Sequence, residues 1–285
     1  MKKNVFIHIG FQKTGSSAIQ NYFNSNRQEL ASSEVDYPLP FDEKLNSHQE
    51  LAWVFMKKGK YDKDAVFSYY RNKIENSDKG NVFISSEDLS LLRGGNVSLL
   101  KSMLEGFNVK ILVYIRDPLD YMLSMYHHKV RMATEDRPFR EYLADEKTRI
   151  VNYKLRLTPW VRNFGEDNII KRAYLPAKFV GGNIATDVFN SIGLDLGFKD
   201  MPKRVNVGVH PWLVAAYQKL GEVNDLSGKE LDMHRRNMRE VSLLLPKIDA
   251  ANYYLGEENA AIIRRVLVES NRDILDQIGY SSEHE

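Results

Sequence analysis

The chain has 285 residues, 43% hydrophobic and 27% charged, which is enough apolar sequence to bury a substantial core. Its formal net charge of +2 argues against a protein that coats nucleic acid, so an anion site must be a local feature. The absence of cysteine excludes disulfides, cysteine-ligated metals and thiol nucleophiles, and it is compatible with a reducing compartment.

The first residues do not form a secretion signal. The amino terminus opens with two lysines, but polar residues interrupt its apolar segment at His8 and from Gln12 onward, so it lacks the ~7–15-residue apolar core of a signal peptide. Apolar runs elsewhere, such as residues 111–115, are far shorter than the ~20 residues that span a bilayer. We therefore expect a cytoplasmic protein with no transmembrane segment and no nucleic-acid partner.

The first two thirds of the chain alternate short β-branched segments with segments of helical periodicity. Strands are predicted over residues 4–9, 81–85, 110–115 and 168–174, and helices over 16–26, 153–164 and 184–192 and directly after Arg116. Strands separated by helices indicate parallel βαβ units, whose ligands gather at the carboxyl ends of the strands. We predict a single domain over 1–285, with a nucleotide-binding α/β core over 1–200. Residues 201–285 form a mainly helical part, with a long helix over 257–278.

The segment Gly10 to Ser17 lies between the first strand and the first helix. Its two glycines have the spacing G-x-x-x-x-G, and backbone N–H groups at such a helix start bind anions. An ordinary phosphate loop has lysine directly after the second glycine, but here Ser16 takes that position and Lys13 lies inside the loop. A lysine there could neutralise the phosphate that departs from a 5′-phosphosulfate, so no metal is required. The alternative is a simple turn capped by Ser16.

A family resemblance begins at this loop. The sequence Phe-Ile-His-Ile-Gly-Phe-Gln-Lys-Thr-Gly-Ser-Ser-Ala-Ile-Gln, from residue 6 to residue 20, resembles the phosphosulfate loop of sulfotransferases that use 3′-phosphoadenosine 5′-phosphosulfate (PAPS), especially carbohydrate-type and bacterial members. The resemblance implies a P-loop NTPase-like fold with a parallel sheet flanked by helices. It also implies PAPS as co-substrate and adenosine 3′,5′-bisphosphate as product. The loop residues implied to bind the 5′ end are Gln12, Lys13, Thr14, Gly15, Ser16 and Ser17.

A second motif of the family is a strand that ends in arginine, followed by a serine on the next helix, and both bind the 3′-phosphate. Arg116 and Ser124 match it here. A guanidinium can bind phosphate oxygens in two-pronged fashion, although Arg116 could instead pair with Asp117. The resemblance ends near Lys203 and Arg204, which are further candidates for the 3′-phosphate or else form a solvated basic turn.

An acceptor hydroxyl needs a proton acceptor close to the transferring sulfur. Glu87 follows the strand 81–85, and relatives often carry a Ser-Glu pair in this place, so Glu87 is the preferred base. The sequence Ser-Ser-Glu-Asp is also a good helix start, which is the structural alternative. His48 is the second candidate, because a neutral imidazole has a suitable pKa, although a lone histidine is more often a surface-loop residue.

Together these patterns predict a sulfotransferase that moves a sulfuryl group from PAPS to a hydroxyl or amine by in-line displacement. The carbohydrate-type loop favours a saccharide, a glycolipid or a polysaccharide precursor as acceptor. A kinase or nucleotide hydrolase would use Glu87 and Asp88 at a magnesium site, but it would need a lysine directly after Gly15. A nucleotide-binding module without chemistry is the third alternative, and the presence of Lys13 together with Arg116 argues against it.

Overall fold

The computed structural model describes residues 2–32, 34–56, 60–145, 150–194, 209–222 and 228–280. The chain divides into two compact units. The first, here the sheet unit, comprises residues 1–116, 153–203 and 273–280. The second, here the helical unit, comprises residues 117–152, 204–272 and 281–285.

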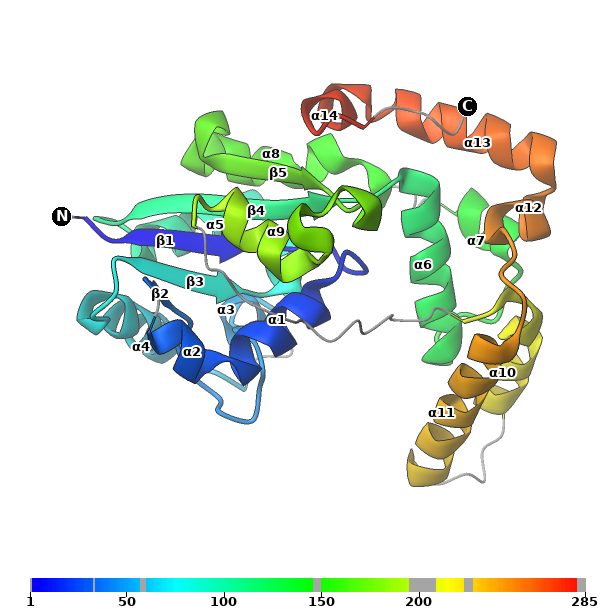
Figure 1. Ribbon diagram of the computed structural model, residues 1–285, viewed down its shortest axis with the longest axis horizontal. Coiled ribbons are helices and arrows are strands. Elements are labelled where there is room, and N and C mark those ends of the chain that lie inside the picture. Colours follow the sequence, from blue (N-terminus) through cyan, green and yellow to red (C-terminus); the bar gives the residue numbers. More distant parts are fainter. Residues whose placement is uncertain are drawn as a thin grey trace. The chain divides into compact units, whose positions relative to one another are not determined.

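The sheet unit is built on five parallel strands in the order β2-β3-β1-β4-β5 (Figure 1). The strands are β1 (Asn4–His8), β2 (Val35–Asp36), β3 (Asn81–Ser85), β4 (Asn108–Ile115) and β5 (Ile169–Ala173). This sheet, flanked by helices, confirms the predicted α/β fold. Four strands lie within two residues of their predicted bounds, whereas β2, with two residues, is too short to show any periodicity.

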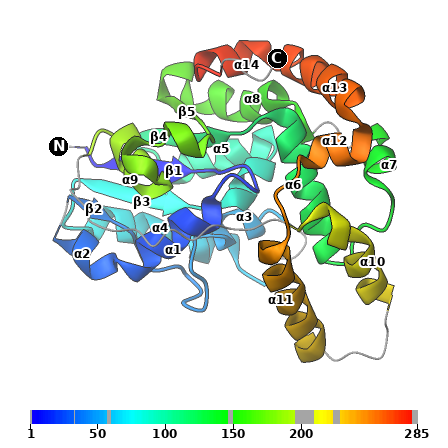
Figure 2. The ribbon, with the colours of Figure 1, turned by 45° about the vertical axis from the view of Figure 1, so that its right-hand side comes forward.

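Both faces of this sheet are covered, so its central strands are apolar without alternation. Val82, Phe83 and Ile84 of β3 are all fully buried. Helices α1, α2 and α9 lie on one face, while α5 and α8 pack together on the other, α8 against β4 (Figures 1 and 2). The helices of this unit are α1 (Ser16–Ser25), α2 (Arg27–Ala31), α3 (Glu50–Trp53), α4 (Lys63–Asn76), α5 (Gly94–Met103), α8 (Tyr153–Phe164), α9 (Ile184–Ser191) and α14 (Arg272–Gln277).

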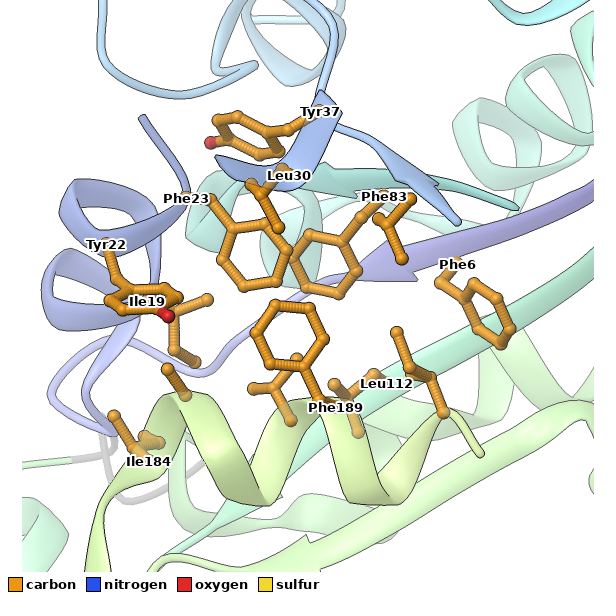
Figure 3. Packing of buried hydrophobic residues seen from close by; sticks show 14 of the residues in the cluster. Phe6, Ile19, Tyr22, Phe23, Leu30, Tyr37, Phe83, Leu112, Ile184 and Phe189 are labelled. Atoms are coloured by element: carbon orange, nitrogen blue, oxygen red, sulfur yellow. The ribbon is translucent and has the colours of Figure 1, made fainter. Parts of the chain in front are cut away.

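An aromatic cluster attaches α1 to the sheet. The ring of Phe23 stacks on Phe83 of β3, with centroids 4.3 Å apart, and on Phe189 of α9 at 5.0 Å (Figure 3). All three side chains are almost completely buried. Burying one phenylalanine contributes ~1.5–3 kcal/mol, so these contacts fix the position of α1 and of the loop that precedes it.

A buried carboxylate holds α9 on the sheet. Asp187 of α9 is 1% exposed and accepts hydrogen bonds from the Tyr114 hydroxyl and the Arg172 guanidinium, each at 2.7 Å. Because Tyr114 belongs to β4 and Arg172 to β5, one side chain ties α9 to two neighbouring strands. A buried charge is tolerated when it is paired and hydrogen-bonded in this way.

The helical unit contains α6 (Pro118–Arg131), α7 (Phe139–Ala144), α10 (Val214–Glu222), α11 (Gly228–Leu244), α12 (Ala250–Leu255) and α13 (Glu257–Glu269). Helix α6 starts at Asp117, whose carboxylate accepts from the Asp120 N–H at 2.9 Å, and Pro118 occupies its first turn. Arg264 of α13 forms ion pairs with both Asp117 and Asp120 and so joins α13 to the start of α6. In the part of the chain that the structure describes, no helix is long and apolar enough to cross a bilayer.

The prediction of one long helix over 257–278 is wrong. Helix α13 ends at Glu269 and α14 begins at Arg272. The Ser270 hydroxyl and the Asn271 amide both donate to the Leu267 carbonyl, at 2.9 Å each. Such side-chain bonds compete with the helical backbone and end the helix.

Candidate active site

The loop between β1 and α1 has an unusual backbone. Lys13 has φ = +66° and Gly15 has φ = +81°, both in the left-handed region. That region costs a lysine roughly 1–2 kcal/mol, which glycine does not incur. Thr14 is buried, and its N–H and its hydroxyl both donate to the Phe11 carbonyl, so this side chain closes the loop from within.

Both glycines of the loop are required by close neighbours. A Cβ on Gly10 would lie 2.7 Å from two ring atoms of His8. A Cβ on Gly15 would lie 2.5 Å from Ile184 Cδ1 and 2.9 Å from the Tyr174 ring. The loop is therefore packed tightly between the end of β1 on one side and α9 with Tyr174 on the other.

The start of α1 has the features of an anion site. No side chain caps the helix at Gly15, and the first N–H groups of a helix have no partner within it. The Ser16 side-chain oxygen is buried and lacks a hydrogen-bond partner among the described residues. Gln12 and Lys13 are partly exposed, and Ser17 is exposed. A buried hydroxyl without a partner is costly unless a ligand or water binds it.

Arg116 follows the carboxyl end of β4. Its carbonyl accepts from the Tyr153 hydroxyl at 2.7 Å, and its guanidinium carbon lies 5.7 Å from the centroid of the Tyr174 ring. Tyr174 is also the ring beside Gly15, so Arg116 and the phosphate loop share one neighbour. Asp117, which could have paired with Arg116, binds Arg264 instead. Within the described residues Arg116 forms no ion pair.

The other predicted phosphate ligands are Ser124, Lys203 and Arg204. Ser124 is partly exposed on α6 of the helical unit. Lys203 and Arg204 lie outside the described residues.

Glu87 begins a short 3₁₀ helix, Glu87–Leu91, two residues after β3 ends. Its side chain is half-buried, and its Oε2 accepts a hydrogen bond from Gln20 Nε2 at 2.7 Å. Its neighbour Asp88 accepts from the indole of Trp53 at 2.7 Å, and Ser86 makes no capping bond. Because β1 and β3 are adjacent in the sheet, Glu87 and the phosphate loop follow neighbouring strands.

His48, the second candidate base, is fully buried; its Nε2 donates to the Pro38 carbonyl at 2.9 Å, and its Nδ1 accepts from the Ser85 N–H at 3.0 Å. Burial lowers the pKa of His48 to about 4. Main-chain groups engage both ring nitrogens, which makes His48 the weaker of the two candidate bases. The surface-loop alternative is wrong.

The sequence did not predict the contacts of three residues beside the loop, His8, Arg156 and Gln20. His8 is fully buried with Nδ1 2.8 Å from Ser85 Oγ, and burial lowers its pKa to about 3. Arg156 of α8 lies over the Phe11 ring at 3.9 Å and donates to Ser90 Oγ at 2.9 Å. Gln20 donates a hydrogen bond to Glu87. The sequence indicates its position only by its spacing, because a residue four positions after Ser16 lies on the same side of α1.

Residues 2–174, more than half of the chain, match the profile of the sulfotransferase domain family. The chain belongs to the sulfotransferase domain family. The match confirms the resemblance seen in the loop and identifies an enzyme of sulfuryl transfer, so the kinase alternative is wrong. It includes Lys13, Glu87, Arg116 and Ser124 and ends before Lys203. In the described ranges no group of three or more His, Asp or Glu side chains could hold a metal ion.

Two solved structures are similar to this sulfotransferase. One is a sulfotransferase from Alicyclobacillus acidocaldarius, with 18% identity and a TM-score of 0.44, covering 83% of this chain and 96% of that one. The other is the mouse sulfotransferase SULT7A1 complexed with PAP, with 13% identity and a TM-score of 0.45, covering 96% of this chain and 86% of that one. A comparison with curated proteins returns no match.

The left-handed backbone conformation of Lys13 should affect the free energy of unfolding. Lys13→Ala keeps the strain and reports what the lysine side chain contributes. Compared with Lys13→Ala, Lys13→Gly should have an equal free energy of unfolding or one higher by up to about 1.5 kcal/mol, because glycine avoids the strain of ~1–2 kcal/mol but loses ~0.5–1 kcal/mol of chain entropy. Denaturant unfolding measures both. A loss of more than about 1 kcal/mol in both variants would mean that the lysine side chain holds the loop together.

The two buried histidines predict loss of stability in acid. Burial lowers the pKa values of His8 and His48 in the folded state. Their contribution to the free energy of unfolding is therefore complete above the unfolded pKa of about 6.5 and declines as the pH falls toward 4. In that window the protonation of each histidine should lower the free energy of unfolding by about 1.4 kcal/mol per pH unit. His48→Asn should be less stable at pH 7 but show a shallower acid slope in urea titrations. An unchanged slope would contradict the neutral state of His48.

Proposed function

We propose that this sulfotransferase moves a sulfuryl group from PAPS to a hydroxyl or amine of its acceptor. The observation that supports this most is the start of α1, where the helix end is uncapped and the buried oxygen of Ser16 has no hydrogen-bond partner among the described residues. The neighbouring Lys13 is held in a left-handed conformation. A phosphosulfate supplies the anionic oxygens that such donors require.

The 5′-phosphosulfate is assigned to Gln12, Lys13, Thr14, Gly15, Ser16 and Ser17. Thr14 uses its hydroxyl within the loop, so its contribution there would come from the main chain. The Lys13 ammonium is the group that would neutralise the charge that develops on the departing phosphate, and no metal is then needed for that purpose. PAPS supplies an activated sulfuryl group when it is bound.

The 3′-phosphate is assigned to Arg116 and Ser124, with Lys203 and Arg204 as further ligands. The Arg116 guanidinium lies near the Tyr174 ring and makes no ion pair with a described residue. A partly exposed arginine without a carboxylate partner is suited to two-pronged phosphate binding.

Glu87 is assigned as the general base. The acceptor oxygen forms a bond to sulfur as the bond between sulfur and the bridging oxygen breaks, and that oxygen stays with the phosphate. The acceptor proton passes to the Glu87 carboxylate. Oε2 is engaged by Gln20, so Oε1 is the oxygen assigned to the proton.

The proposed acceptor is a saccharide, a glycolipid or a polysaccharide precursor. The support is the resemblance of the loop to carbohydrate-type sulfotransferases. The absence of cysteine supports the further proposal of a cytoplasmic location. We also propose that both units act as one sulfotransferase domain.

Nucleotide binding tests the assignment of Arg116. Adenosine 3′,5′-bisphosphate should raise the melting temperature in the presence of EDTA, because a ligand at 100 times its Kd adds about 2.7 kcal/mol. At the same concentration 5′-AMP should give a smaller shift. Arg116→Ala should reduce the first shift to the level of the second, as measured by thermal denaturation. Equal shifts from both nucleotides with the unsubstituted protein would contradict a 3′-phosphate site.

The base is tested by Glu87→Gln, which keeps the size and the hydrogen bond from Gln20 but removes the basic oxygen. General-base catalysis is worth ~10²–10⁴-fold, so kcat should fall at least about 100-fold while adenosine 3′,5′-bisphosphate still binds. His48→Asn is the control, and its folded fraction should keep a kcat within a few-fold of normal. A normal kcat in Glu87→Gln together with a large loss in His48→Asn would assign the base to His48.

A further inference from the structure

The Gln20 side chain is a buried polar group on the loop-bearing helix. It is 5% exposed, and its Nε2 donates to Glu87 Oε2 at 2.7 Å and to Ser85 Oγ at 3.3 Å. The amide thus donates one hydrogen to Glu87 and the other to Ser85, at and just after the end of β3. A buried amide with two such partners has a fixed orientation.

The neighbouring hydrogen bonds define which way this amide faces. Since Ser85 Oγ accepts from Gln20, its own hydrogen can go to His8 Nδ1 at 2.8 Å. His8 can accept it because burial keeps the imidazole neutral. If the amide were turned over, its oxygen would face the Glu87 carboxylate, so the bond to Glu87 is maintained by the whole series of contacts.

Gln20 also links two parts of the proposed reaction. It lies four residues after Ser16, so both side chains project from the same side of α1, about one turn apart. The first turn of α1 is assigned to the 5′-phosphosulfate, and Gln20 contacts the assigned base. One helix therefore carries both the residues assigned to the anion and the residue that holds one oxygen of the Glu87 carboxylate.

We propose that Gln20 is a positioning residue for the general base Glu87. Its N–H holds Oε2, limits rotation of the carboxylate and leaves Oε1 for the acceptor proton. This inference rests on the proposed function, because it takes Glu87 as the base.

Other charged and titratable groups face Glu87 from the elements around it. The Arg156 guanidinium of α8 binds the Ser90 hydroxyl, which itself donates to the Glu87 carbonyl at 2.8 Å. Burial raises the pKa of the Tyr37 phenol, which follows β2, and the charge of Glu87 contributes a smaller part. Asp88 is the next residue of the 3₁₀ helix and is bound by Trp53 of α3. Because these groups stay unchanged in a Gln20 variant, a change in kcat reports on the amide.

The test is Gln20→Met, which keeps the length of the side chain and removes both donors, with Asn21→Met on the exposed side of the same helix as matched control. Misplacing a catalytic group by about 1 Å costs up to ~100-fold, so we expect kcat to fall roughly 10- to 100-fold in Gln20→Met. The KM for PAPS and the thermal shift with adenosine 3′,5′-bisphosphate should stay unchanged. This split between kcat and KM distinguishes a positioning role from a general loss of structure, which would also weaken nucleotide binding.

A double-mutant cycle separates this inference from the assignment of the base. If Gln20 acts through Glu87, adding Gln20→Met to Glu87→Gln should cause no further loss of kcat. A full additional loss would show that Gln20 acts elsewhere and would overturn the inference. If Glu87→Gln itself has a normal kcat, the base assignment fails first. If Glu87→Gln is impaired while Gln20→Met behaves like Asn21→Met, the base stands and only the role of Gln20 is wrong.

A second substitution covers the case in which Gln20→Met folds poorly. Gln20→Glu keeps the size and replaces both donors by a carboxyl group next to Glu87, so kcat should fall at least as far as we expect for Gln20→Met while the thermal shift with adenosine 3′,5′-bisphosphate stays unchanged. A kcat close to that of Asn21→Met would overturn the inference.

Discussion

The contact of the Phe23 ring with Phe83 and Phe189 is the interaction on which the site depends most. It attaches helix α1 at once to the inner strand β3 and to helix α9. The first turn of α1 carries the proposed phosphosulfate ligands, and its next turn carries Gln20. A slight rotation of this helix would move the anion ligands and the contact to Glu87 together. The apolar core thus holds in place the helix that carries these residues.

The loop between β1 and α1 has little conformational freedom because neighbouring side chains pack closely against it. Gly15 adjoins Ile184 and the Tyr174 ring, and Ile184 belongs to the helix that Asp187 ties to β4 and β5. The loop is therefore held in place before any ligand arrives. A preformed site avoids the cost of ordering its donors during the reaction. The strained backbone of Lys13 fits this arrangement, since strain persists only where the surrounding structure enforces it.

The sequence allowed the fold to be predicted well where the signal is local. Strand β3 and the start of α1 follow from apolar runs, glycine spacing and helical periodicity, all of which lie within a few residues. The roles of His48 and Gln20 could not be derived in this way. His48 binds Ser85, 37 positions away, and Gln20 binds Glu87, 67 positions away, so both contacts depend on how distant segments pack. The break after Glu269 was missed because periodicity does not show that Ser270 and Asn271 bond back to the helix.

Tyr174 is a shared neighbour of the phosphate loop and of Arg116. The same ring adjoins Gly15 and lies near the guanidinium of Arg116, and its own N–H is bonded to the Ile115 carbonyl at 2.7 Å. The loop and the arginine therefore have one aromatic side chain as a common neighbour. A substitution of Tyr174 would remove a contact from the loop and from the arginine at the same time.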